Sequence, residues 1–401
     1  MTTFRRSRLR AFAAALAVLA LATPQAAPAQ TKPAPYVINV VLSLTGSAAF
    51  SAASHHETLV EFERYIDSHG GIRGRPIHFD FHDDESNPAV AVQITNGLLP
   101  SKPIVILGSG IVATCSAMAP LMVNGPVQYC ISPGFFPKPG SNSFSASTSL
   151  DYLVPAVLRF MRDKGYKRLA VVSATDATGQ SADHATLDGL RRPENKGITV
   201  VDYEHVSPAD VSMSAQISNL KSARPDAVVA WVTGTPFGTV LRALNDAGLD
   251  VPVLTSAANM NRDQLAQYAR FIPKRLYFNS FRFFDRAHIA PGPLKTNVDA
   301  FFDQFRKDGV KPSPDSSYAW DVGLIVVSAL RDLGLNATPE ALREYIFNIR
   351  SFVGINGVYD FATHDQHGLT DSAIIVVRWV PEKGDWVAVS TPFAKPLAHE
   401  P

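Results

Sequence analysis

The chain has 401 residues, of which 46% are hydrophobic and 18% charged, so it is too long for one hydrophobic core and too apolar to be disordered. The 37 Lys and Arg nearly balance the 36 Asp and Glu, which argues against nucleic acid or an anionic membrane surface as the main partner. Two Cys are too few for a disulfide scaffold or for a zinc site made of four cysteines. We expect a globular protein with at least two domains.

The first 29 residues have the pattern of an export signal. Four arginines lie between residues 5 and 10, an Ala/Leu/Val run covers residues 11–22, and Ala27-Pro28-Ala29 has the spacing of a cleavage site. The apolar run is shorter than the roughly 20 residues that a membrane-spanning helix needs. We expect residues 1–29 to be removed and the mature protein to be exported; the adjacent Arg5 and Arg6 leave a twin-arginine export route open.

After this signal, strand and helix patterns alternate in two series. The first series has strands at 36–42, 77–81, 104–107 and 127–131, and helices at 57–68 and 88–99. The second has helices at 152–164, 184–190, 213–223 and 238–247, and strands at 168–172, 199–203, 227–232 and 251–254. A polar stretch, 140–149, separates the two series. This alternation predicts an α/β fold of two doubly wound, Rossmann-like lobes.

The pattern changes after Tyr277. Helical segments are expected at 297–307, 318–333 and 339–349, and a β-hairpin at 373–380 and 385–389. This tail is consistent with helices that return to the first lobe and a hairpin that returns to the second. The chain would then cross between lobes near 145–150, 280–285 and 353–360. Lobe one would comprise 30–147 and 284–354, lobe two 148–283 and 355–401, with a ligand enclosed between them.

Cys115 and Cys130 are expected to form a disulfide. Export places them in an oxidising compartment, and a helix-like segment, 116–124, followed by a short strand separates them. In a strand–helix–strand unit both cysteines would lie at the carboxyl end of the sheet. Two buried free thiols remain the alternative.

Several short stretches resemble, in the same order, the periplasmic solute-binding proteins of ABC importers of the Leu/Ile/Val-binding type. The matching residues are Leu44-Thr45-Gly46, 69–76, Asp83-Asp84 with Pro88, 104–108, 224–228, 247–249, 318–321 and 357–361. The resemblance implies the type I periplasmic binding fold with three crossovers. It also implies a monomeric periplasmic receptor that closes on one small solute and delivers it to an ABC permease without catalysis or cofactor.

Ligands of doubly wound sheets bind beyond the carboxyl ends of the strands. This rule selects the loops at 45–51, 109–116, 132–136, 174–181, 233–237 and 255–259. The candidate ligand-binding residues in or beside them are Thr114, Ser116, Ser132 and Gly134 for a carboxylate, Phe50, Phe135 and Phe136 for an apolar body, and Thr178, Trp231, Thr233, Thr235 and Asn259 from lobe two.

This chain departs from the family pattern where an amino acid's ammonium would bind. The resemblance implies a Ser/Thr pair for the carboxylate and an aromatic and an acidic residue in lobe two for the ammonium. Here Thr178 replaces the expected tyrosine and Ala257 stands at the position of the acid. A buried ammonium without a carboxylate partner costs several kcal/mol. We therefore expect an aromatic or branched aliphatic acid as ligand; Asp176 could replace the missing acid, which leaves an α-amino acid open.

Other chemistry has little support in the sequence. There is no phosphate-binding loop, H-E-x-x-H or G-x-S-x-G motif. His55 and His56 are expected to be solvated at a helix start, and His364 with His367 leaves only a weak metal site open. Arg282 is expected in an interlobe ion pair, or else on the ligand carboxylate. We expect no metal, cofactor or catalytic residue; an exported sensor of the same fold is the alternative to a transport receptor, and an exported enzyme ranks third.

Overall fold

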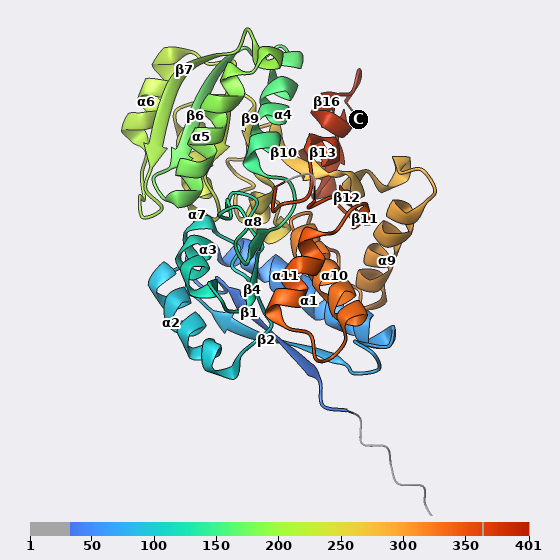
Figure 1. Ribbon diagram of the computed structural model, residues 1–401. Helices are drawn as coiled ribbons and strands as arrows, with labels where there is room; N and C mark the ends of the chain where they lie inside the picture. Colours follow the sequence, from blue (N-terminus) through green and yellow to red (C-terminus); the bar gives the residue numbers. More distant parts are fainter. Residues whose placement is uncertain (1–32, 363–364, 401) are drawn as a thin grey trace, which may run out of the picture. The chain divides into compact units, whose positions relative to one another are not determined.

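Two β-sheets organise the protein in the computed structural model, which describes residues 33–362 and 365–400 (Figure 1). The expected export signal, 1–29, lies outside the described residues. The first sheet and its helices are drawn blue to cyan with orange α10 and α11, and the second sheet green to yellow with the red strand β13. They form the two lobes that the alternating pattern predicted.

The first sheet is entirely parallel, with the strand order β2-β1-β3-β4-β5. Its strands are β1 (Tyr36–Leu42), β2 (Ile77–Asp83), β3 (Val105–Gly108), β4 (Val127–Cys130) and β5 (Ser143–Ser145). The helices between them are α1 (Ala49–Ser68), α2 (Pro88–Leu98) and α3 (Val112–Met118). Six of the seven residues of β1 are buried, as expected of a parallel strand covered on both faces.

The second sheet has the order β14-β13-β10-β9-β8-β6-β7. Its strands are β6 (Arg168–Ala174), β7 (Thr199–Val206), β8 (Ala227–Trp231), β9 (Val253–Thr255), β10 (Leu276–Phe281), β13 (Ile374–Val380) and β14 (Asp385–Ala388), and its helices are α4 (Leu150–Asp163), α5 (Ala177–Arg191), α6 (Ser214–Ala223), α7 (Thr235–Asp246) and α8 (Arg262–Gln267). The last two strands pair antiparallel with each other and with β10. The prediction that the C-terminal hairpin returns to the second lobe is confirmed.

Three later helices return to the first lobe, namely α9 (Pro293–Lys307), α10 (Ser316–Leu333) and α11 (Pro339–Phe347). They pack through aromatic rings: Trp320 on α10 meets Phe62 on α1 and Phe301 on α9, both at 5.0 Å between ring centroids. Edge-to-face pairs of this kind add to the burial energy of the rings. The returning helices thus complete the core of the first lobe.

Asp321 on α10 explains two of the sequence motifs. Its buried carboxylate accepts hydrogen bonds from the backbone N–H groups of Ile355 and Asn356 at 2.7 and 2.9 Å and from the Tyr359 hydroxyl at 2.9 Å. Burial raises its pKa to about 6, against the lowering effect of these bonds. The motif at 318–321 therefore anchors the motif at 357–361 to the first lobe.

Three elements differ from the expected pattern. The polar stretch 140–149 contains the strand β5, because Phe144 is buried against Tyr129, Phe347 and Phe361. Helix α1 begins at Ala49 rather than at residue 57. Its first turns are rich in Ala and Ser, which favour or tolerate a helix but give no hydrophobic period. Strand β10 was not singled out by the alternating pattern.

The segments that cross between the lobes lie side by side. Thr148 pairs with Leu369, and the Ser145 backbone N–H donates to the Gln366 carbonyl at 3.0 Å. The ring of Phe361 also packs on Tyr129 and Phe144 of the first lobe. These contacts bring residues 145–148 and 366–369 together; the third crossing expected at 353–360 stays a prediction.

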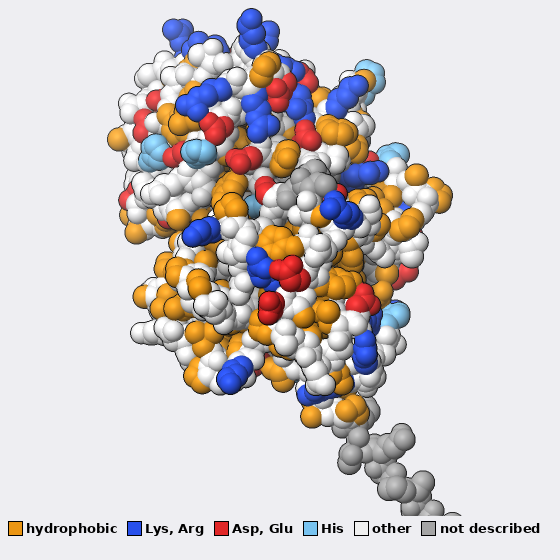
Figure 2. Space-filling view, in the orientation of Figure 1, with side chains coloured by type: hydrophobic (Ala, Val, Ile, Leu, Met, Phe, Trp, Pro, Cys, Tyr) orange, Lys and Arg blue, Asp and Glu red, His pale blue; other side chains and the backbone are white. Residues whose placement is uncertain are grey.

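The described surface and helices show two further features. On the face in Figure 2, acidic and basic side chains lie intermixed over both lobes. Of the helices in the described residues, none is both long and apolar enough to cross a membrane.

Candidate ligand-binding site

A cavity of about 70 Å³ lies between the lobes, beyond the carboxyl ends of strands from both sheets. From lobe one, α1, α10 and the loops after β3 and β4 contribute Ser51, His55, Tyr318, Gly110, Ile111 and 131–134. From lobe two, α4, α5, β8, β10 and the loops after β8 and β9 contribute Leu150, Leu153, Thr178, Ala182, Trp231, Thr233, Ser256, Ala258 and Asn279. The cavity lies where the topology rule predicted a ligand.

Most of the cavity wall is apolar. Trp231 is buried, and its indole N–H donates to Thr186 Oγ1 at 3.0 Å, which leaves its ring to face the cavity. Leu150, Leu153 and Ile131 add aliphatic surface. At Gly134 a Cβ would lie 2.9 Å from Val112 Cγ2 and 3.3 Å from Leu150 Cδ1, so the absence of a side chain lets the two lobes approach here.

His55 is the main polar group on the lobe-one side. Its side chain is only 2% exposed, and neither ring nitrogen has a hydrogen-bond partner among the described residues. Burial lowers its pKa to about 4, so the ring is neutral at neutral pH. Asp315 Oδ2 lies 4.0 Å from His55 Nε2 and accepts from Ser51 Oγ at 3.2 Å. Burial raises the pKa of Asp315, so its neutral form is also favoured.

Asn279 is the main polar group on the lobe-two side. It is fully buried in β10, and its Oδ1 accepts from the backbone N–H of Ala257 at 3.2 Å. Its Nδ2 has no hydrogen-bond partner within the described part of the chain, and the same holds for Ser256 Oγ. The hydroxyl residues Thr178 and Thr233 line the cavity beside them.

The described part of the cavity wall carries no charged side chain. Among the described residues that line it there is no Asp, Glu, Lys or Arg. Ala257, the position of the expected acid, is buried in the core, while its uncharged neighbours Ser256 and Ala258 face the cavity. Asp176 caps helix α5, where its Oδ1 accepts from the Gly179 N–H at 3.0 Å. It lines a small adjoining recess that shares Thr178 and Thr233 with the cavity.

Five of the expected site residues line this cavity: Ser132, Gly134, Thr178, Trp231 and Thr233. The other seven do not, and three of them are the polar residues Thr114, Ser116 and Asn259. The Thr114 hydroxyl donates to the Ile111 carbonyl at 2.9 Å, and Ser116 is exposed on the outer side of α3. The amide of Asn259 is used within lobe two: Oδ1 accepts from Gly234 N–H at 2.9 Å, and Nδ2 donates to Val232 O and Thr255 Oγ1 at 2.8 and 2.9 Å.

The three phenylalanines expected around the ligand do not form an aromatic wall. Phe135 is buried against the cysteine pair, and Phe136 is 42% exposed with its ring 5.6 Å from that of His367. Phe50 lies in the first turn of α1 and is only half-buried. Position in a loop does not fix the direction of a side chain; Trp231 and Tyr318 supply the aromatic surface of this cavity, and the role of the three phenylalanines in binding stays a prediction.

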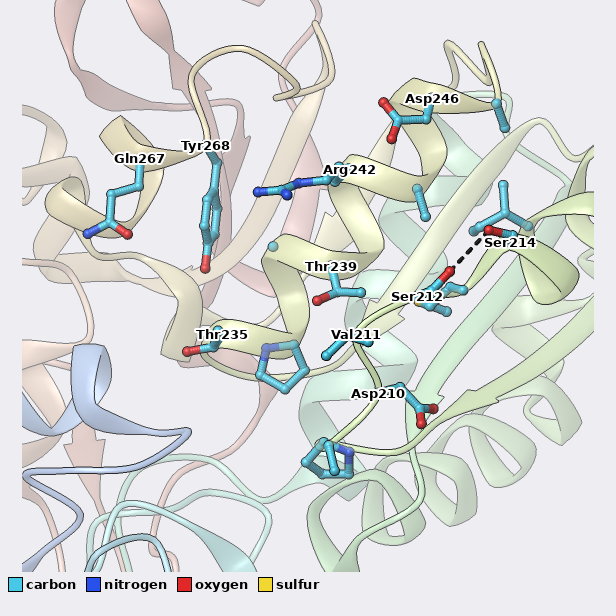
Figure 3. A pocket seen from close by; sticks show the side chains of 18 of the residues that line it. Asp210, Val211, Ser212, Ser214, Thr235, Thr239, Arg242, Asp246, Gln267 and Tyr268 are labelled. Atoms are coloured by element: carbon cyan, nitrogen blue, oxygen red, sulfur yellow. Dashed lines mark hydrogen bonds between the residues drawn. The ribbon is translucent and has the colours of Figure 1, made fainter.

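Phe50 and Thr235 line a different and larger groove, of about 770 Å³. Figure 3 shows this groove, with Thr235 and Arg242 on α7 and Arg242 pointing toward Tyr268. Ser212 and Ser214 hydrogen-bond to each other at 3.1 Å on its other side. Apart from Phe50, its lining comes from lobe two alone. The groove therefore lacks the two-sided enclosure of the cavity.

Cys115 and Cys130 form the predicted disulfide, with 6.0 Å between their Cα atoms. Cys115 lies in α3 and Cys130 ends β4. The loops next to them, at Gly110-Ile111 and at 131–134, both line the cavity. The disulfide therefore joins the two lobe-one loops that face the ligand space.

Sequence reasoning missed His55, Tyr318 and Asn279. His55 was expected to be solvated, but it is buried because α1 starts early and places it on the face of Leu59, Phe62 and Ile66. Extending the helical period backward from Leu59 would have given this signal. Arg282 does not line the cavity. The described residues contain no group of three or more His, Cys, Asp or Glu that could hold a metal ion; His364 lies outside them.

Comparisons with known proteins agree with this architecture. Residues 35–385 match the family described as periplasmic binding protein. The Leu/Ile/Val-binding protein homolog 3 of Brucella melitensis biotype 1 is 29% identical over 249 residues, 57% of this chain and 63% of that protein, so the match spans somewhat less than two thirds of that relative.

Two solved structures share the fold. An extracellular ligand-binding receptor from Rhodopseudomonas palustris has a TM-score of 0.79 at 20% identity, covering 89% of this chain and all of that one. A fatty acid ABC transporter substrate-binding protein from Thermomonospora curvata has a TM-score of 0.73 at 18% identity, covering 92% of this chain and 96% of that one. The resemblance seen in the sequence motifs is thus confirmed, and the chain belongs to the periplasmic binding protein family, with the type I two-lobed fold.

Proposed function

We propose that this protein is a monomeric, exported solute-binding receptor of an ABC importer that closes on a small carboxylate, an aromatic or branched aliphatic acid rather than an α-amino acid. In this role it acts in the periplasm and delivers the ligand to a membrane permease. The observation that carries the proposal is the composition of the cavity wall, which combines apolar surface with neutral polar groups and, in the described residues, lacks an acid to pair an ammonium.

The carboxylate is expected on the lobe-one side. His55 offers a buried ring N–H that is free of other partners among the described residues, and Ser132 adds a hydroxyl. A neutral imidazole donates one hydrogen bond, and an approaching anion favours its protonated form. The apolar body of the ligand would then lie against Trp231 and the leucines of α4, where its burial contributes about 25 cal/mol per Å².

An α-amino acid is the second candidate, for one structural reason. Asp176 lies in the recess next to the cavity, and only its Oδ1 is used by the cap of α5. The name of the Brucella melitensis relative, a Leu/Ile/Val-binding protein homolog, also favours this candidate. If an amino acid binds, Asp176→Asn should abolish its binding and leave the binding of simple acids unchanged.

Calorimetry of the exported protein with leucine, 4-methylpentanoate and benzoate separates the two candidates. We expect the acids to bind and leucine to bind at least tenfold more weakly. His55→Gln should weaken acid binding about tenfold, since it removes the ring that meets the anion. His56→Gln, on the neighbouring half-buried position, is the matched control and should change nothing. Micromolar leucine binding without any response to the acids would overturn the proposal.

Delivery to a permease is tested in cells. Deletion of the gene should abolish growth on the bound acid as carbon source, and re-expression should restore it. Normal growth of the deletion strain, combined with a lost transcriptional response to the acid, would instead assign the protein to sensing.

A further inference from the structure

The amide of Asn279 has a fixed orientation. Its oxygen accepts the Ala257 backbone N–H at 3.2 Å, and a backbone N–H can only donate. The amide nitrogen therefore has to be the atom left over, and it has no hydrogen-bond partner within the described residues although the residue is fully buried. Buried N–H groups without an acceptor are rare in folded proteins. An acceptor from outside the chain is the natural partner for this one.

The neighbours of Asn279 do not supply that acceptor. Asn279 approaches the Tyr318 hydroxyl closely enough to oppose the rise in its pKa caused by burial, yet without the geometry of a hydrogen bond. Ser256 Oγ, on the same side of the cavity, also lacks a partner among the described residues. A hydroxyl can donate or accept, whereas the amide nitrogen only donates. The amide nitrogen of Asn279 therefore suits a ligand oxygen and opposes an ammonium, which is itself only a donor.

The placement of His55 and Asn279 around one side chain sets the position of that oxygen. His55 from lobe one and Asn279 from lobe two line the same space of about 70 Å³. Both residues flank Tyr318: the ring centroid of His55 lies 6.4 Å from that of Tyr318, and Asn279 approaches the Tyr318 hydroxyl. A ligand whose carboxylate meets His55 therefore presents to Asn279 an atom close to that carboxylate, namely a substituent of its α-carbon.

We infer that the cavity selects acids whose α-carbon carries an oxygen acceptor, namely 2-oxo acids, with Asn279 Nδ2 donating to the α-carbonyl oxygen. This inference rests on the proposed function and names its ligand class. It assigns to Asn279 the discrimination between a 2-oxo acid and the amino acid of the same carbon skeleton. The amino acid would place a donor against a fixed donor, and the unsubstituted acid would leave the amide unpaired.

Three ligands with one carbon skeleton test the inference by calorimetry on the exported protein. These are 4-methyl-2-oxopentanoate, 4-methylpentanoate and leucine. We expect the 2-oxo acid to bind roughly 10- to 100-fold more tightly than either of the others, the range for an unpaired buried donor. Equal binding of 4-methylpentanoate and the 2-oxo acid, or tightest binding of leucine, would overturn it. The comparison needs no variant, so it does not depend on how a substitution folds.

Asn279→Asp then tests the residue itself. The substitution keeps an oxygen for the Ala257 N–H and replaces the donor by an acceptor. We expect the affinity for the 2-oxo acid to fall at least tenfold and the preference over leucine to be lost or reversed. Asn219→Asp, which adds the same charge on the exposed face of α6, is the control and should leave the affinities unchanged. An unchanged ligand order in Asn279→Asp contradicts the role of this amide.

The outcomes also separate this inference from the proposed function. Binding of 4-methylpentanoate and 4-methyl-2-oxopentanoate with equal affinity leaves the carboxylate receptor intact and removes only the 2-oxo selectivity. If neither of these acids, nor phenylpyruvate and benzoate, binds at millimolar concentration, the carboxylate receptor itself is wrong.

Discussion

The two walls of the cavity are held by different kinds of bond. In lobe one a disulfide, Cys115–Cys130, joins the loops that carry Gly110 and Ser132. In lobe two the corresponding loops are joined by buried asparagine amides, with Asn259 linking the loops after β8 and β9 and Asn279 linking β10 to Ala257. The loops of the lobe-one wall are therefore linked covalently, and those of the lobe-two wall are linked by hydrogen bonds.

The two kinds of bond differ in what remains when one of them is removed by substitution. A disulfide stabilises mainly by restricting the unfolded chain, and its loss leaves no buried polar group behind. A buried amide that bonds several backbone groups leaves each of them unpaired when it is removed. We therefore expect lobe two to be more sensitive to a single substitution than lobe one.

Asn259→Ala should have the largest effect. It leaves the Gly234 N–H, the Val232 carbonyl and the Thr255 hydroxyl without this partner, at about 1–3 kcal/mol for each buried group. The free energy of unfolding, measured by urea denaturation, should fall by about 4 kcal/mol. Asn219→Ala on the exposed face of α6 is the control and should cost less than about 0.5 kcal/mol. If Asn259→Ala lowers the free energy of unfolding by less than 1 kcal/mol, lobe two is not the more sensitive of the two lobes.

Removal of the disulfide should have the second-largest effect on stability. Replacing Cys115 and Cys130 together by Ala should lower the free energy of unfolding by about 3 kcal/mol, the value for a loop of about 15 residues. Ligand affinity should fall as well, because the loops at Gly110 and Ser132 are then no longer joined. Reducing the wild-type protein should reproduce both losses and leave the double variant unchanged. If affinity stays constant while stability falls, the disulfide serves the fold of lobe one but not its cavity wall.

The burial of His55 makes the stability of the lobe-one wall depend on pH. Its pKa falls from 6.5 in the unfolded chain to about 4 in the folded protein, because burial disfavours the charged imidazolium more than the contact with Asp315 favours it. As pH falls from 6.5 to 4, the unfolded chain takes up a proton that the folded protein does not, so this contribution to stability is lost. The loss amounts to about 2–3 kcal/mol.

Asp321, with a pKa raised to about 6, acts in the opposite direction, because its stabilising contribution is lost as pH rises through that value. The His55 effect is therefore isolated as a difference between variants. His55→Gln should lose about 2–3 kcal/mol less stability than wild type between pH 6.5 and 4 in urea titrations at each pH. His56→Gln, with a ring that is only half-buried, should follow wild type more closely. Parallel curves for His55→Gln and wild type would mean that His55 is not buried in solution.

The sheets and the disulfide could be predicted from the sequence, because their signals are local. Continuous apolar runs marked β1 and β8, and the strand–helix–strand order placed both cysteines at one sheet edge. The export signal stays a prediction, since it lies outside the described residues.

The cavity could be predicted only in part, because the direction of a loop side chain depends on tertiary contacts. Phe135 and Phe136 are adjacent, yet one packs on the disulfide and the other faces solvent. Asn259 and Asn279 show the same limit. The topology rule selected the loop of Asn259, whose amide is used inside the fold, and passed over Asn279, which lies within a strand and keeps a free donor.

Asn261 connects the two walls, and its substitution should give the smallest effect. It caps α8, with Oδ1 accepting from Gln264 N–H at 3.0 Å, and its Nδ2 donates across the cleft to Phe50 O and Ser54 Oγ on α1, both at 3.1 Å. Asn261→Asp keeps the cap but turns a carboxylate oxygen toward the Phe50 carbonyl. The closed form should lose about 1 kcal/mol, so ligand affinity should fall about fivefold with little change in the unfolding of the empty protein. Asn87→Asp makes the same change at the cap of α2, where the amide oxygen accepts from Ala89 N–H at 2.9 Å, and should leave affinity unchanged. Equal affinities of both variants would mean that the contact between α1 and α8 does not contribute to closure, and that each wall acts on the ligand independently.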